Sequence, residues 1–263
     1  MFARNKSGRP SESALIRRRG RSVIKSAGRS LELLELFRDL KQPLRLTDIA
    51  TQLSMPQSSA SMLVRSLVSM GYLLQDGRTY VPSMRLTLLG NWLNDRMFVQ
   101  GNLQSLINEI SHLTGDTVIL ATRNGIFVEV LGVARGRMDV LYHTRPGEAR
   151  HLTRALMGHM ILSTLERQDA ERLVTRINAE QRKADRRVKF QSLVPSLDRI
   201  RLDGYGYSEE TFPGSANLAI LLRNAPHGDC LVLGNVGTTD RIRPRKEQIL
   251  NIVKGAMARY LRS

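Results

Sequence analysis

Residues 46–70 constrain this chain most, because they predict two short helices that meet at a tight corner. The run LTDIATQL has apolar residues at helical spacing, Ser54-Met55-Pro56 interrupts it, and QSSASMLVRSLVSM resumes it. Such a corner can place one helix in the DNA major groove, and it can also be plain core packing in a helical domain. The corner alone leaves both interpretations open.

The charge of the chain favours an anionic partner. Its 263 residues carry a formal net charge of +16 and have a pI near 10.9, which fits binding to nucleic acid or to an anionic membrane surface. Residues 1–29 hold nine basic side chains and one acid, so half of the excess charge lies there. We predict a flexible basic arm over residues 1–26. A solvated tail that only aids solubility is the alternative.

Several classes of protein lack support in the sequence. No apolar run follows the basic N-terminal residues, which argues against a secretory signal. No stretch of about 18 apolar residues predicts a membrane span. Cys230 is the single cysteine, so neither an intramolecular disulfide nor a CxxC metal pair is expected. A cytoplasmic protein is the expectation, and 41% hydrophobic residues suffice for a buried core.

The residues before the corner predict a three-helix unit. Leucines and Phe37 recur at spacings of three and four over residues 26–40, which predicts an amphipathic helix that Pro43 blocks. Thr47 is expected to cap the second helix, with Asp48 in its first turn. That helix is predicted to pack through Ile49, Ala50 and Leu53.

The third helix divides into an apolar and a polar face. The side chains expected to point inward are Ala60, Leu63, Val64, Leu67 and Met70. Those expected on the opposite face are Gln57, Ser58, Ser61, Met62, Arg65 and Ser69. Small hydroxyl side chains let a helix approach the groove floor, glutamine can pair with adenine, and arginine can pair with guanine or phosphate. Serines that only solvate an exposed face are the alternative.

A hairpin is predicted after the third helix. Gly71 can end the helix in a left-handed conformation, and two β-prone runs, residues 72–74 and 79–81, flank an Asp-Gly turn. Three helices and a hairpin make a winged helix-turn-helix over residues 27–85, with Arg78 at the wing tip. The predicted DNA contacts are Thr47, Gln57, Ser58, Ser59, Ser61, Met62, Arg65 and Arg78.

These segments resemble the DNA-binding half of the IclR family of bacterial transcriptional regulators. The resemblance covers about residues 27–90 and rests on the leucine-rich first helix, the break proline, the Gly71-Tyr72 pair and the wing residue Tyr80. Two positions differ from the family: Ser54 replaces the usual turn glycine, and Met62 stands where arginine is usual. The resemblance implies a regulator that lacks one familiar arginine contact, with Arg65 as its candidate replacement.

The second half predicts an α+β domain over residues 103–263, after a linker helix over residues 86–102 with an interruption near Gly90. TVILA, IFVEVLGV and RMDVLYH have strand patterns, and Asn124-Gly125 predicts a hairpin between the first two. Further predicted elements are helices over 154–165, 169–179 and 190–202, strands over 217–222 and 230–236, and a final helix over 246–261. This order is typical of an antiparallel sheet with helices packed against it.

The second half resembles the GAF-like effector-binding domain of the same family, through TVILA, RALMGHMILS and GSANLAILL. The resemblance implies an effector pocket formed by Leu141, Thr144, Gly158, His159, Asn217, Gly234 and Val236. Cysteine is common in the family at 217, and serine at 234 and 236, so this pocket has a less polar back wall. A larger or partly aromatic organic acid is favoured, with Arg150 or Arg154 as counter-ion. The alternative is that this pocket no longer binds any ligand.

Motifs for catalysis or metal binding are not found in the sequence. His143, His151 and His159 recur every eight residues, a spacing that does not place them on one face of a short helix. No HExxH, GxSxG, Walker or strand-linked GxGxxG motif occurs. Cys230 lies in an apolar strand pattern that suits a buried thiol. We expect no catalytic residue, no metal and no cofactor.

Two functions remain open. The first is a ligand-responsive regulator that binds palindromic operator DNA as a homodimer or a dimer of dimers, with the effector favouring one arrangement. The second is a small-molecule-binding enzyme or sensor domain with an incidental basic N-terminal region. The order of the predicted domains and the position of the charge favour the first.

Overall fold

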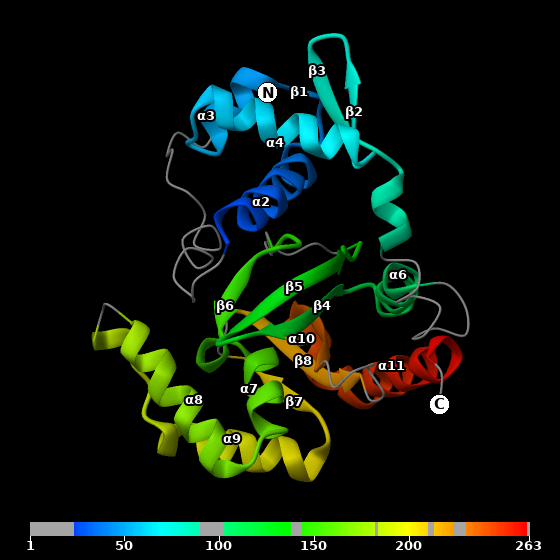
Figure 1. The fold of residues 1–263 in the computed structure, drawn as a ribbon. Helices are drawn as coiled ribbons and strands as arrows, with labels where there is room; N and C mark the ends of the chain where they lie inside the picture. The colour runs from blue at the N-terminus through cyan, green and yellow to red at the C-terminus, as the bar shows by residue number, and fades with distance from the viewer. Residues whose placement is uncertain are drawn as a thin grey trace. The chain divides into compact units, whose positions relative to one another are not determined.

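Two units make up the computed structural model, one over Leu15–Leu93 and a larger one that includes Asn94–Ser263 (Figure 1). The structure describes residues 24–89, 102–137, 144–181, 184–209, 213–222 and 230–261. The predicted basic arm therefore lies almost wholly outside the described residues. Its last part does not, because helix α2 begins at Lys25.

The smaller unit is a winged helix-turn-helix, as predicted (Figure 1). Its helices are α2 (Lys25–Leu40), α3 (Leu46–Gln52) and α4 (Gln57–Ser69). Strands β1 (Leu44–Arg45), β2 (Leu73–Asp76) and β3 (Thr79–Pro82) form an antiparallel sheet in the order β1-β3-β2. Aliphatic side chains and one aromatic ring fill the core, among them Leu33, Phe37, Ile49, Val64 and Leu73.

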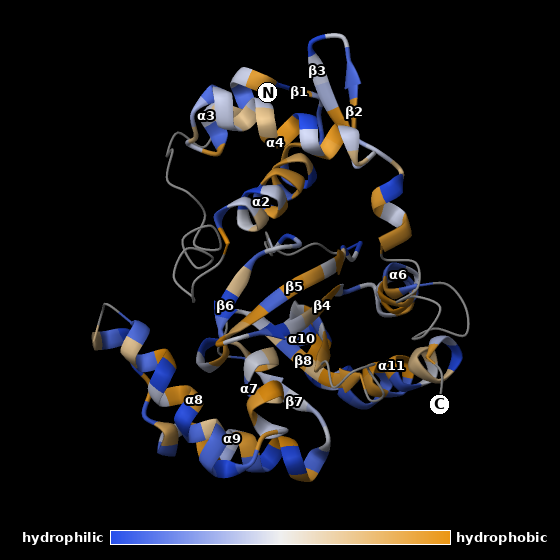
Figure 2. Cartoon of the chain, in the orientation of Figure 1, coloured by the Kyte–Doolittle hydropathy of each residue, from blue (hydrophilic) through white to orange (hydrophobic). Residues whose placement is uncertain are grey.

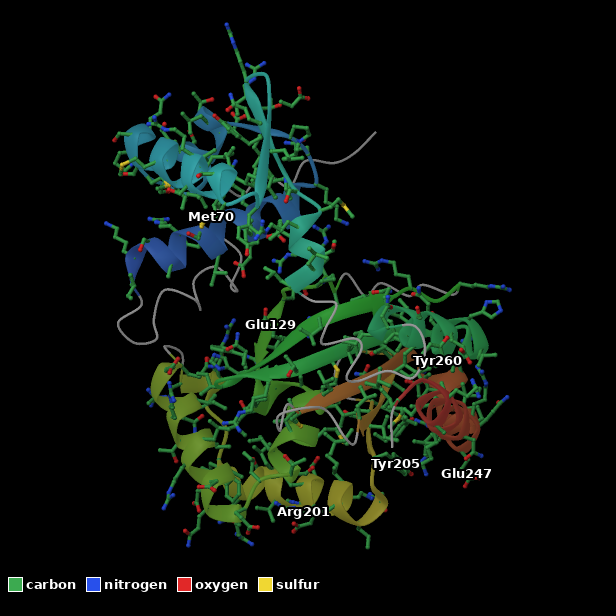
Figure 3. All side chains as sticks on the ribbon, turned by 45° about the vertical axis from the view of Figure 1, so that its right-hand side comes forward. Met70, Glu129, Arg201, Tyr205, Glu247 and Tyr260 are labelled. Atoms are coloured by element: carbon green, nitrogen blue, oxygen red, sulfur yellow. The ribbon has the colours of Figure 1, made fainter. Side chains whose placement is uncertain are left out.

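Two local predictions for this unit are wrong. Helix α3 begins at Leu46, two residues earlier than a cap at Thr47 requires, so Thr47 lies inside the helix and does not cap it. The carboxylate of Asp48 accepts a hydrogen bond from the Arg45 backbone N–H at 3.1 Å instead. Met70 was expected to point inward, but it is 51% exposed just beyond the last turn of α4 (Figure 3). The chain has left the helical path there, because Gly71 turns it with φ +78°.

The larger unit is built on a six-stranded antiparallel sheet in the order β6-β5-β4-β9-β8-β7. The strands are β4 (Thr117–Asn124), β5 (Phe127–Ala134), β6 (Ala149–His151), β7 (Gly206–Ser208), β8 (Ser215–Leu222) and β9 (Leu231–Thr238). The predicted Asn124-Gly125 hairpin joins β4 to β5, with Gly125 at φ +61°. The predicted strand over 137–143 lies almost wholly outside the described residues.

Helices cover both faces of this sheet. They are α6 (Leu103–Thr114), α7 (Leu156–Ser163), α8 (Arg167–Glu180), α9 (Phe190–Asp203), α10 (Thr239–Ile242) and α11 (Lys246–Tyr260). On one face α6 and α11 pack against Val118, Leu218 and Leu233, and on the other α7, α8 and α9 pack against Ala121, Ala219 and Val232. The sheet lies between two hydrophobic cores, which explains why α7 is mostly apolar (Figure 2).

The helix predicted over about residues 154–165 is confirmed as α7, which is two residues shorter at each end. A 3-10 turn (Leu152–Arg154) comes first, Ala155 is extended, and α7 follows. Gly158 makes this arrangement possible, since a Cβ atom there would lie 2.1 Å from the carbonyl oxygen of Leu152. The break matters because it brings the beginning of α7 over the sheet.

The linker prediction is only partly covered by the structure. Residues 85–89 are helical, and residues 90–101 lie outside the described part of the chain. A new helix, α6, begins at Leu103 after the extended residue Asn102, whose side-chain oxygen accepts a hydrogen bond from the Ser105 N–H at 2.9 Å. None of the helices within the described ranges is long and apolar enough to cross a membrane.

A buried ion pair holds the C-terminal end of α6. The carboxylate of Asp116, 1% exposed, lies 3.0 Å from Arg241 and 3.8 Å from Arg245. Arg245 also donates to the Thr114 carbonyl at 3.0 Å, which satisfies one of the free carbonyls at the helix end. Since Arg241 belongs to α10, the cluster ties α6 to the segment directly after β9.

Candidate functional site

The helix-turn-helix corner depends on an unusual backbone conformation at Ser54. This residue has φ +50°, in the left-handed region that favours glycine. Its N–H donates to the Thr51 carbonyl at 3.1 Å, and the Met55 N–H donates to the Ala50 carbonyl at 3.0 Å. Pro56 then leads into α4. Ser54 therefore adopts the left-handed conformation that glycine, the usual residue of the family at this position, adopts more easily.

The outer face of α4 is exposed. Gln57, Ser58 and Arg65 are exposed, Ser59 and Ser61 are partly exposed, and Met62 is 64% exposed. The inward face consists of Ala60, Val64 and Leu67, all buried, with Leu63 partly buried. The polar and apolar faces of α4 are thus separated as the sequence predicted, apart from Met70.

Two further candidates extend this surface. Thr47, on α3, and Gln57, at the start of α4, line the same shallow hollow at the corner, together with Thr51 and Ser54. Arg78 is exposed in the turn of the wing, directly after Gly77. The structure therefore brings Thr47 close to the beginning of α4 and leaves Arg78 on the wing.

Two arginines position these elements. The Arg29 guanidinium donates to the Leu53 carbonyl at 2.6 Å and to Glu32 at 2.7 Å, so it fastens α2 to the end of α3. It was counted among the charges of the basic arm, but it belongs to the folded unit. Arg85 lies over the ring of Tyr72, 5.4 Å from its centroid, where the chain leaves the wing.

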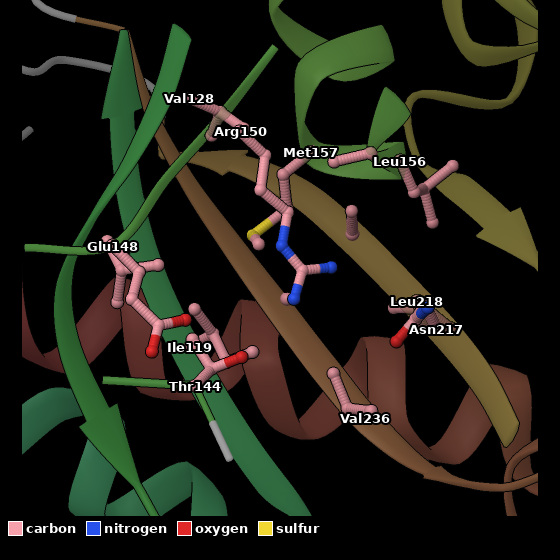
Figure 4. A pocket seen from close by; sticks show the side chains of 14 residues that line it. Ile119, Val128, Thr144, Glu148, Arg150, Leu156, Met157, Asn217, Leu218 and Val236 are labelled. Atoms are coloured by element: carbon pink, nitrogen blue, oxygen red, sulfur yellow. The ribbon is translucent and has the colours of Figure 1, made fainter. Parts of the chain in front are cut away.

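The larger unit contains a cavity between the sheet and the beginning of α7 (Figure 4). Strands β4, β8 and β9 form its floor through Ile119, Asn217, Ala219, Gly234 and Val236, and β5 contributes Val128 and Val130. Ala155, Leu156 and Met157 cover it. Its empty volume is about 570 Å³ when the open solvent at its mouth is counted. Most of the lining is apolar, as in sites for small organic molecules.

A few polar groups converge on this cavity. Thr144 is 6% exposed and Asn217 is 7% exposed. Glu148 and Arg150 are the charged side chains among the described residues that line it. They are two positions apart in extended chain at β6, so both project from the same side of the strand. Figure 4 shows the Arg150 guanidinium pointing into the cavity. Arg150 is itself an exposed residue, so the site offers a solvent-accessible cation beside a mostly apolar lining.

Gly234 lets Met157 lie on the floor of the cavity. A Cβ atom at Gly234 would lie 3.0 Å from the Met157 sulfur. A glycine within a strand often marks such a close approach. Met157 is flexible and polarizable, so this wall of the cavity can adapt to a bound molecule.

The structure brings together only part of the predicted effector site. Thr144, Asn217, Gly234 and Val236 line the cavity, and Leu141 lies outside the described residues. Neither Gly158 nor His159 is among the lining residues. Gly158 packs against Leu152, and the imidazole of His159 lies 3.2 Å from the Thr153 carbonyl and 3.5 Å from the Ser196 hydroxyl.

Sequence reasoning also missed lining residues. Of the two suggested counter-ions, Arg150 lines the cavity and Arg154 does not. Glu148 and Met157 were not predicted. The alternation of Glu148 and Arg150 is too short to show a strand period, and Met157 lies within an apolar helix pattern that suggests only core packing.

Cys230, His151 and His159, the described residues among those considered for catalysis or metal binding, pack against other residues of the fold. Burial raises the pKa of the Cys230 thiol, which disfavours the nucleophilic thiolate. His151 stacks on Phe127, with ring centroids 4.5 Å apart. No three His, Cys, Asp or Glu side chains in the described part of the chain are placed to hold a metal ion.

Comparison with known proteins matches both units. The IclR helix-turn-helix domain model matches residues 26–77, and the model for the C-terminal part of the bacterial transcriptional regulator IclR matches residues 94–259. The chain is 23% identical over 208 residues to the HTH-type transcriptional regulator XynR of Escherichia coli, which covers 77% of this chain and 81% of XynR. It is 21% identical over 227 residues to the Pca regulon regulatory protein of Pseudomonas putida, covering 81% and 74% of the two chains.

Solved structures share the fold. An IclR homologue from Microbacterium hydrocarbonoxydans, complexed with 4-hydroxybenzoate, superposes with a TM-score of 0.67 at 16% identity, covering 89% of this chain and 98% of the other. An IclR regulator from Alicyclobacillus acidocaldarius gives a TM-score of 0.66 at 21% identity, covering 90% and 97%. The two domain matches together span most of the chain, and it belongs to the IclR family of bacterial transcriptional regulators.

Proposed function

We propose that this regulator senses a small organic acid in the cavity of its larger unit and changes its affinity for operator DNA in response. Family membership makes the protein a DNA-binding transcriptional regulator with an effector domain. The choice of an acid rests on one observation: the Arg150 guanidinium points into a largely apolar cavity that also contains the Asn217 amide. Arginine and an amide N–H group can both donate to a carboxylate.

The apolar lining supports an acid with a hydrophobic or aromatic body. Val128, Val130, Leu156 and Val236 present no hydrogen-bonding side chain, and Gly234 adds none where serine is usual in the family. The Microbacterium homologue holds 4-hydroxybenzoate, an acid of this kind. A two- or three-carbon acid would leave much of this apolar surface uncovered.

The outer face of α4 is the proposed reader of the operator. Gln57, Ser58 and Ser61 lie at or near its N-terminal end, from which base edges are reached, and Ser59 lies among them. Met62 can contact a thymine methyl group where arginine is usual. Thr47, Arg65 and Arg78 are proposed to contact the DNA backbone. Binding as a homodimer or a dimer of dimers fits a palindromic operator.

Two measurements test this function. Affinity for a duplex from upstream of the protein's own gene is expected to fall steeply with salt and to exceed affinity for random DNA. A thermal-shift screen of aliphatic and aromatic acids is expected to find stabilisation by aromatic monoacids. Equal affinity for both duplexes would contradict the DNA-reading role, and stabilisation by none of the acids would contradict the proposed effector class.

A further inference from the structure

Glu148 gives the cavity a second charge that binding of a carboxylate does not require. It is the acidic member of the described lining residues, and its backbone carbonyl accepts a hydrogen bond from the Val130 N–H at 2.8 Å. That bond holds the backbone of the residue against β5, so its side chain starts from a fixed point on the cavity wall. An acid that binds Arg150 must therefore be accommodated near a carboxylate.

The two charges are arranged so that one molecule can meet both. Glu148 and Arg150 project from the same side of the strand, and in the view of Figure 4 Glu148 and Thr144 lie to one side of the Arg150 guanidinium, with Asn217 to the other. A ligand carboxylate on Arg150 and Asn217 would leave its other end toward Glu148 and Thr144. Apolar side chains surround the space between these groups.

The chemistry of Glu148 distinguishes ligands of equal size. An ionised carboxylate only accepts hydrogen bonds, so a hydroxyl or amino group of the ligand can donate to it. A second ligand carboxylate would meet it as a like charge, which an apolar enclosure makes less favourable than water does. An unsubstituted acid would leave Glu148 partly desolvated without a donor.

We propose that Glu148 is a specificity-determining residue, and that the cavity selects monocarboxylic acids with a hydrogen-bond donor at their far end and rejects dicarboxylic acids. This inference rests on the proposed acid-sensing function. It goes further, because a site containing Arg150 alone would accept benzoate, 4-hydroxybenzoate and terephthalate according to size and charge.

The experiment compares these three probes on the full-length chain by isothermal titration. The wild type is expected to bind 4-hydroxybenzoate at least about tenfold more tightly than benzoate, and terephthalate most weakly. Glu148→Gln keeps the side-chain volume and removes the charge. It is expected to improve terephthalate binding at least about tenfold and to reduce the preference for 4-hydroxybenzoate. Glu171→Gln, at an exposed position on α8, is the matched control and should change neither ratio.

The outcomes separate this inference from the function on which it rests. Unchanged ratios in Glu148→Gln, with all three acids still bound, would show that Glu148 only balances the charge of Arg150; this would overturn the inference and leave acid sensing intact. Binding of none of the three acids to the wild type would overturn both. If the melting temperature of Glu148→Gln in the absence of ligand is lower than that of the wild type, Glu148→Ala supplies a second measurement. This variant must also bind terephthalate more tightly than the wild type does.

Discussion

The two candidate sites differ in how the chain assembles them. The proposed DNA-reading surface comes mostly from one helix, α4, with Thr47 and Arg78 added from nearby segments. The cavity draws its lining from five strands, a helix and a loop, from Ile119 to Val236. The first site is a surface that one amphipathic helix largely supplies, and the second exists only when the strands of the sheet have come together. Changes to single residues should therefore act locally on α4 and more widely around the cavity.

The largest expected effect comes from Gly158→Ala. Its Cβ atom would lie 2.1 Å from the Leu152 carbonyl oxygen, and backbone cannot yield as a flexible side chain does. We expect the larger unit to lose about 3 kcal/mol or more of stability, with the cavity distorted. Chemical denaturation followed by circular dichroism measures this loss.

Gly255→Ala is the control for this prediction. Gly255 also lies within a helix, α11, but its nearest neighbour at the Cβ position is the Arg259 guanidinium at 3.6 Å. Alanine there should leave stability unchanged or raise it by up to about 1 kcal/mol. Equal losses in the two variants would contradict the packing explanation for Gly158.

Arg150→Gln should weaken acid binding in the cavity without changing DNA binding by the smaller unit. Loss of a charged hydrogen-bonding partner is expected to weaken binding of the best acid by about 10- to 100-fold, with DNA affinity in the absence of acid unchanged. Titration calorimetry measures the first quantity and fluorescence anisotropy the second. Arg154→Gln is the matched control, since Arg154 is exposed like Arg150 but does not line the cavity. A similar loss in the control would show that general charge, not the position of Arg150, attracts the acid.

Gln57→Ala tests whether α4 acts alone. We expect the preference for the operator over single-base variants to fall by about 1–2 kcal/mol at one position, with stability unchanged because the side chain is exposed. Competition binding with a set of singly substituted duplexes measures this preference. Weaker binding to every duplex by the same factor would assign Gln57 to the DNA backbone instead.

The smallest expected effect is that of Gly234→Ser. The new side chain would press on the Met157 sulfur at 3.0 Å, and a thioether can move aside. We expect a stability change under about 1 kcal/mol and acid affinity lowered less than about tenfold, since Met157 would move into the cavity. A loss as large as that of Gly158→Ala would mean that Met157 is fixed and not adaptable.

The contrast between a surface from one helix and a cavity from many segments also explains what the sequence could predict. The period of Ala60, Val64 and Leu67 is a local signal that tertiary contacts reinforce, so α4 was found with its faces correctly assigned. Thr47 and Met70 were misplaced because a shift of one or two residues at a helix end changes whether a residue caps the helix or which way it points. These errors are confined to helix boundaries.

The cavity could be predicted only in part. Asn217, Gly234 and Val236 were found by resemblance, because they lie on long apolar strands. Glu148 was missed because it lies directly before β6, a strand of three residues that is too short to show a period. Gly158 was assigned to the pocket, but its contact with Leu152 depends on a 3-10 turn that no local pattern announces.

The most direct test of the account measures DNA affinity with and without acid in two variants. Anisotropy with the duplex from upstream of the gene, in the presence of a saturating concentration of the best acid from the screen, should show wild-type affinity changed at least about fivefold. Arg150→Gln should bind the same duplex as tightly as the wild type without acid and should need about 10- to 100-fold more acid for the same response. An equal acid requirement in Arg150→Gln, or no response in the wild type, would contradict the claim that an acid in this cavity controls DNA binding.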